Sequence, residues 1–130
     1  MDETTTRPAT GTDAVALGME WLDENAPGWR NNVDPRQLDI DDPWSCVLAQ
    51  VSKGQGWFAE SEPEGYGTPY GVGLDRAPIA RDEEGHQTYS GRRDWTQDHG
   101  FMVNWDAVEN GDATWSSGGL MAGWRAALAA

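Results

Sequence analysis

Eight tryptophans, spread from Trp21 to Trp124, are the feature that most limits how this chain can fold. Only 38% of its 130 residues are hydrophobic, which is below the usual share in a globular domain. Because each indole can bury a large area, tryptophans from separate segments can support a small core. We therefore expect one domain built on aromatic anchors. The predicted core residues are Leu17, Trp21, Leu22, Trp29, Leu38, Val47, Leu48, Val51, Phe101, Leu120 and Trp124.

Apolar residues recur at helical spacing in separate stretches, which predicts a mainly α fold: a small single-domain bundle of three to four short helices. The first helix is expected to begin at a Thr12 or Asp13 cap and to end near Asn25, before Pro27. The last is expected to follow a Ser116 or Ser117 cap. A short helix is predicted over 93–98, closed by a glycine at position 100. Residues 1–11 are predicted to be a disordered lead, and 12–130 to form the domain.

The stretch "LDIDDPWSCVLAQV" at 38–51 holds three aspartates and the single cysteine. Asp42 followed by Pro43 is typical of a helix N-cap and first helical position. Trp44 and the apolar residues at 47, 48 and 51 would then share the buried face. The aspartates fail the spacing of a calcium loop, because tryptophan and glutamine stand where glycine and glutamate are required. We predict a capped helix here, and no metal or cofactor site.

Residues 56–92 are rich in glycine, proline and acidic residues, which predicts a long irregular acidic insertion with a small hairpin near "YGTPYGVGL". Aromatic residues among turn residues suit a binding surface, although they also suit a loop that anchors itself to a small core. The candidate partner-binding residues in this segment are Trp57, Phe58, Tyr66, Tyr70, Glu60, Glu62 and Glu64.

The net charge of −13 excludes direct nucleic-acid binding through a basic patch and disfavours anionic membranes. No apolar run approaches the length of a membrane span, and no signal peptide is recognised. Cys46 has no partner cysteine, which agrees with a reducing compartment. We therefore expect a soluble, cytoplasmic protein. The same charge leaves open a nucleic-acid mimic, whose carboxylates would occupy a basic groove on another protein.

The blocks "WLDENAPGWRNNVDPRQLDIDDPWSCVLAQV", "HGFMV" and "LMAGWRAAL" resemble short proteins without an assigned activity from actinobacteria and actinobacteriophages. The resemblance covers about half of the chain. It implies an origin and an architecture but no reaction. Two departures are Ala49, where the pattern has glycine, and the length of residues 56–92.

Taken together, these observations predict a non-enzymatic acidic protein-interaction module, an accessory protein of a phage or prophage that binds a host protein in the host cytoplasm. No catalytic residue is predicted. The alternative is a small enzyme in which Cys46 is the nucleophile and His99 the base, because a thiol near a helix start can be activated by the helix dipole. A lone cysteine beside an apolar face, however, more often packs as a small hydrophobic residue.

Overall fold

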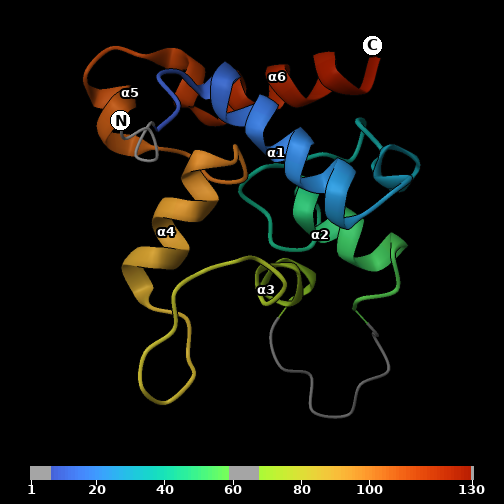
Figure 1. The fold of residues 1–130 in the computed structure, drawn as a ribbon. Helices are drawn as coiled ribbons and strands as arrows, with labels where there is room; N and C mark the ends of the chain where they lie inside the picture. The colour runs from blue at the N-terminus through green and yellow to red at the C-terminus, as the bar shows by residue number, and fades with distance from the viewer. Residues whose placement is uncertain (1–6, 59–67, 130) are drawn as a thin grey trace.

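A computed structural model describes residues 7–58 and 68–129 of the chain (Figure 1). The fold is mainly α-helical, as predicted, but the described residues form six α-helices rather than three or four. None of these helices is both long enough and apolar enough to cross a membrane. The helices are α1 (Gly11–Asn25), α2 (Val47–Gly54), α3 (Pro69–Leu74), α4 (Tyr89–Asp98), α5 (Trp105–Glu109) and α6 (Ser117–Ala129), with 3-10 turns η2 (Trp29–Asn32) and η3 (Ala113–Trp115).

The prediction that Thr12 or Asp13 caps the first helix is wrong, because the cap of α1 lies two to three residues earlier. Thr10 is its N-cap, and the Thr10 hydroxyl accepts from the Asp13 amide at 3.1 Å. Gly11 then approaches the backbone of Thr114 so closely that a Cβ would lie 1.9 Å from the Thr114 carbonyl oxygen. The part of the predicted disordered lead that the structure describes is held in place, because Arg7 forms an ion pair of 2.6 Å with Asp98. Residues 1–6 lie outside the described residues.

The core is a chain of aromatic rings that joins the first, fourth and last helices. Trp124 stacks on Phe101, with centroids 5.4 Å apart, and meets Trp29 edge-on at 5.8 Å. Trp95 also stacks on Phe101 and meets Trp21 edge-on at 5.1 Å. Of the predicted core residues all are buried except Leu17, which is half-buried. The tryptophans therefore hold separate helices together, as their distribution predicts.

Close packing of α1 against α6 depends on a glycine. A Cβ at Gly18 would lie 2.1 Å from the His99 carbonyl oxygen and 2.9 Å from the Trp124 ring. The absence of a side chain here lets Trp124 lie directly against α1, and α1 runs alongside α6 in Figure 1. The predicted cap of α6 is confirmed, because the Ser116 hydroxyl accepts from the Gly119 amide at 3.0 Å.

The prediction that Asp42 caps a helix beginning at Pro43 is wrong. The Asp42 carboxylate accepts from the Trp44 amide, two residues on, and so closes a local turn. Helix α2 begins only after Cys46, whose sulfur accepts from the Ala49 amide at 3.4 Å. Since Trp44 precedes the helix, it does not lie on the buried face and is 43% exposed.

The predicted insertion is partly helical. Helix α3 occupies the stretch where a hairpin was expected, because Thr68 caps it through the Gly71 amide and Pro69 fills its first turn. Helix α4 begins at Tyr89 rather than near Arg93, and Gly100 follows its end with a φ of 74°, as predicted. Irregular backbone joins these helices, and its β pairing in the described part is a single bridge, Arg81 to Gln87.

Candidate functional site

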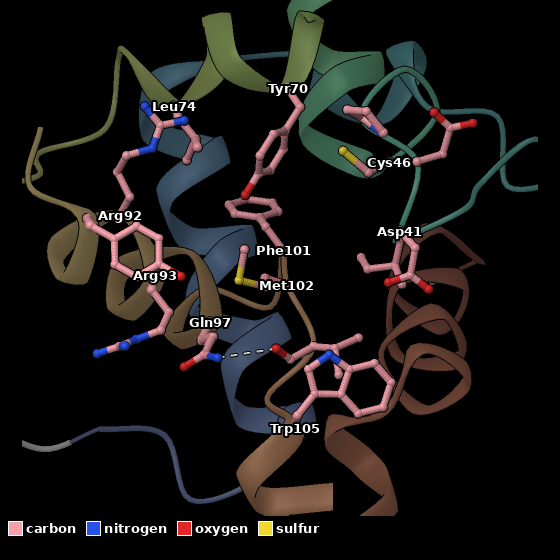
Figure 2. A pocket seen from close by; sticks show the side chains of 15 residues that line it. Asp41, Cys46, Tyr70, Leu74, Arg92, Arg93, Gln97, Phe101, Met102 and Trp105 are labelled. Atoms are coloured by element: carbon pink, nitrogen blue, oxygen red, sulfur yellow. Dashed lines mark hydrogen bonds between the residues drawn. The ribbon is translucent and has the colours of Figure 1, made fainter.

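A cavity of about 570 Å³ lies between the 40–46 turn, α3, α4 and the segment that enters α5 (Figure 2). We call it the aromatic cleft. Its lining residues are Ile40, Asp41, Asp42, Pro43, Cys46, Tyr70, Leu74, Tyr89, Arg92, Arg93, Gln97, Phe101, Met102, Val103 and Trp105. Its volume falls in the range of protein sites that hold small ligands or the side chains of a bound peptide.

The inner wall of the cleft is apolar and is fixed by the core. Phe101 lines the cleft, and its ring stacks on Trp124. Leu74 lies at the end of α3, which packs on α2 through Gly73; a Cβ at that glycine would lie 2.6 Å from Leu48. Because both residues are buried at least 98%, the inner wall is part of the folded core rather than an adjustable loop.

Tyr70 descends into the cleft from α3 (Figure 2). Its amide donates to the Pro43 carbonyl at 3.2 Å, which joins α3 to the 40–46 turn. Burial raises the pKa of the Tyr70 phenol, although a hydrogen bond with Thr96 opposes that shift. Tyr70 therefore stays neutral at physiological pH and supplies a hydroxyl within an otherwise apolar wall.

Two exposed aromatic residues flank the cleft. Tyr89 is 81% exposed and Trp105 is 61% exposed. Each is the first residue of its helix, after a capping Thr88 or Asn104 whose side chain accepts an amide proton three residues on. The cap fixes where each helix starts, and the first residue then projects beside the cleft. Gln97 adds a link between the two sides by donating to the Val103 carbonyl at 3.2 Å.

The charged residues of the cleft lie on two sides. Asp41 and Asp42 belong to the 40–46 turn, and Arg92 and Arg93 belong to α4. Arg92 donates to the Gln87 side chain at 3.2 Å, whereas Arg93 pairs with the Asp94 carboxylate at 3.2 Å. One oxygen of Asp41 accepts from the Ser117 hydroxyl at 2.6 Å.

Cys46 lines the cleft but is 1% exposed. Burial raises the pKa of its thiol to about 11, even though the backbone amides of the first turn of α2 oppose this rise. A thiol with this pKa is protonated at neutral pH and is a poor nucleophile. The Cys46 sulfur accepts a hydrogen bond from the Ala49 amide in the first turn of α2.

His99, the base of the alternative hypothesis, serves the core instead. Its ring stacks on Trp95, with centroids 4.1 Å apart, and its Nδ1 donates to the Trp95 carbonyl at 2.7 Å. Burial lowers the pKa of the imidazole, so the ring is neutral at physiological pH. It caps the end of α4, as its sequence position predicts, and is not among the residues that line the cleft with Cys46.

Two of the three aspartates of the 38–51 stretch, Asp39 and Asp42, close local turns. Asp39 accepts from the Asp41 amide at 3.0 Å, in the same way that Asp42 accepts from Trp44. Among the residues that the structure describes, no group of three or more histidine, cysteine or carboxylate side chains is arranged to hold a metal ion.

The three predicted partner-binding residues that the structure describes, Trp57, Phe58 and Tyr70, lie in different surroundings. Tyr70 lines the cleft, whereas Trp57 meets Trp21 edge-on at 6.4 Å and lies beneath Arg76, which fits the alternative that the loop anchors itself to the core. Phe58 meets the half-exposed Trp44 at 5.4 Å. The remaining candidates, Tyr66, Glu60, Glu62 and Glu64, lie outside the described residues.

Sequence reasoning missed Tyr89 and Trp105 as site residues. A signal was present, because each aromatic residue directly follows a threonine or asparagine that can cap a helix. Tyr89 carried a further signal of exposure, because no apolar residue stands three or four positions on to share a helix face with it.

Comparisons of the chain with protein-family models, with curated proteins and with solved structures find no match. The resemblance to short actinobacterial and phage proteins therefore stays an expectation from the sequence.

Proposed function

We propose that this protein is a non-enzymatic protein-interaction module that binds its partner through the aromatic cleft. One observation carries the proposal: Tyr89 and Trp105, the most exposed large hydrophobic side chains of the described residues, flank the same apolar cavity. Tyrosine and tryptophan are the residues that most often anchor protein interfaces, especially next to a pocket that excludes water. A chain that needs tryptophans for its core gains no folding energy from an indole left in water.

The cleft suits a partner's apolar side chain better than a reaction. Its inner wall offers carbon atoms from Phe101 and Leu74, and its central polar group is the neutral hydroxyl of Tyr70. Catalysis through Cys46 would need a thiolate and a base in reach, and the contacts of Cys46 and His99 favour neither. We also propose that the partner is a host protein and that the chain is an accessory protein of a phage or prophage. This part of the proposal rests on the sequence resemblance alone.

Site-specific photo-crosslinking tests the proposal. A benzoylphenylalanine replaces Tyr89 or Trp105 in turn, and the protein is irradiated in an actinobacterial lysate. A matched control carries the same probe at Ala122, which is exposed on α6 and does not line the cleft. We expect the same cross-linked species from positions 89 and 105 and none from position 122. Cross-links that are equal at all three positions, or absent from both cleft positions, would contradict binding through the cleft.

A further inference from the structure

We infer that the segment bound in the aromatic cleft is a basic peptide, in which an apolar side chain enters the cavity and a lysine or arginine beside it lies between Trp105 and Asp41. This inference rests on the function proposed above and names the chemistry of the partner.

The overall charge selects among partners before contact. A net charge of −13 on 130 residues attracts a basic segment at long range and repels an acidic one. The same charge opposes a second copy of this chain as the occupant, since the two copies repel each other. The partner that the whole surface favours is therefore a basic protein.

The 40–46 side of the cleft carries negative charge that no ion pair within the described residues neutralises. Asp41 is exposed and Asp42 half-buried, and both line the cleft. Each carboxylate uses one oxygen inside the molecule, Asp41 for the Ser117 hydroxyl and Asp42 for the Trp44 amide. Neither takes part in any of the ion pairs of the described residues. A cation from a partner would supply the missing counter-charge.

Trp105 provides a second group that favours a cation at the same place. Figure 2 shows Asp41 and the Trp105 indole on the same side of the cleft. An ammonium or guanidinium group over an indole face is attracted by the ring, and a nearby carboxylate adds to that attraction. Because the indole is 61% exposed, its surface is available to a partner.

The basic side of the cleft attracts an acidic partner less. Figure 2 places Arg92 and Arg93 on the side opposite Asp41. Arg93 already pairs with Asp94, and Arg92 donates to Gln87. Among the described residues Asp41, Asp42 and Arg92 form no ion pair, so two carboxylates and one guanidinium of the cleft lack a counter-charge, and this imbalance favours a basic occupant over an acidic one.

Peptide titration tests the inference. Three blocked pentapeptides carry a central leucine flanked on both sides by lysine, by serine or by glutamate. Each is titrated into the full-length 15N-labelled protein at about 150 mM salt, where long-range attraction is screened beyond about 8 Å. The Trp105 indole N–H and the Cys46 and Phe101 amides report on the cleft. We expect the lysine peptide to shift these resonances with a Kd at least about tenfold below that of the glutamate peptide.

Two double variants separate the carboxylates of the cleft from the net charge. Asp41→Asn with Asp42→Asn removes the acidic side but keeps the acceptor oxygens that Ser117 and Trp44 use. Asp75→Asn with Glu109→Gln makes the same charge change at exposed positions outside the cleft. We expect the first pair to weaken the lysine peptide about fivefold and the second to leave its Kd within about twofold.

The outcomes distinguish the two proposals. If the serine and glutamate peptides shift the cleft as strongly as the lysine peptide, the inference is wrong and the proposed function stands. If both double variants weaken the lysine peptide equally, net charge alone attracts it, and the site between Trp105 and Asp41 is refuted. If no peptide shifts the three reporters at millimolar concentration, the cleft does not bind peptides, and the proposed function fails with the inference.

Discussion

Replacing Trp124 with phenylalanine tests how far the aromatic core holds this fold together. The indole is fully buried, stacks on Phe101 and meets Trp29 edge-on. Its Nε1 donates to the Gly100 carbonyl at 2.7 Å, which ties α6 to the turn after α4. Phenylalanine keeps part of the stacking but removes this donor and about half of the ring system.

The expected loss follows from these contacts. A buried carbonyl left without its donor costs about 1–2 kcal/mol. The space left by the smaller ring costs about 1–2 kcal/mol more, because the neighbouring rings of Phe101 and Trp29 are themselves held by other contacts. We expect the free energy of unfolding to fall by about 2–4 kcal/mol. This loss is large but stays below the roughly 5–15 kcal/mol that stabilises a typical domain, so the variant should still fold.

Urea denaturation followed by circular dichroism measures the change. With an m-value of about 2 kcal/mol/M that stays constant, the midpoint should fall by roughly 1–2 M. Trp105→Phe is the matched control, since it makes the same chemical change at an exposed indole and should alter stability by less than about 0.5 kcal/mol. Equal midpoints for the two variants would refute the role given to Trp124.

Three further predictions concern the packing and the titratable groups. Gly18→Ala should destabilise the protein by at least about 1–3 kcal/mol, because the new Cβ would meet the His99 carbonyl. The control Gly118→Ala, with open space around it, should be neutral or slightly stabilising. Equal urea midpoints for the two variants would argue against the close packing of α1 and α6. Burial lowers the pKa of folded His99 below its ordinary 6.5, so the unfolded chain takes up a proton first and stability should fall as pH drops through 6.5. The slope of the thermal midpoint against pH should flatten in His99→Gln but not in the control His86→Gln, whose imidazole is exposed. An unchanged slope in both variants would count against a buried neutral imidazole at position 99. Cys46, with a pKa of about 11, should react with iodoacetamide at pH 7.5 only as fast as the protein unfolds; labelling within seconds in the native protein would instead revive the nucleophile hypothesis.

Much of the fold follows from sequence rules, and two errors concern the same rule. Periodicity correctly places α1 and α6, and the distribution of tryptophans correctly identifies Trp21 and Trp124 as core residues. The rule that a capping residue followed by proline starts a helix fails at Asp42. Its carboxylate accepts from the Trp44 amide two residues on, whereas a helix cap would accept from the amide three residues on. The same rule would have found α3 at Thr68, where a hairpin was expected.

The aromatic cleft could not be derived from the sequence, because four separate segments form it. Asp41, Tyr70, Tyr89 and Trp105 come together only when α3 packs on α2 and α4 packs on α1. Periodicity shows where helices form along the chain. It does not show where α3 meets the 40–46 turn, which is joined to α3 by the hydrogen bond from the Tyr70 amide to the Pro43 carbonyl. Such contacts between distant segments leave no local pattern.

Hydroxyl-radical footprinting of the complex with the cross-linked partner, once that partner is purified, locates the binding surface. We expect that binding protects Tyr89, Trp105 and Met102, which line the cleft, while Trp44 stays as reactive as in the free protein. Unchanged reactivity at the three cleft residues, with protection on another face, would show that the partner binds elsewhere.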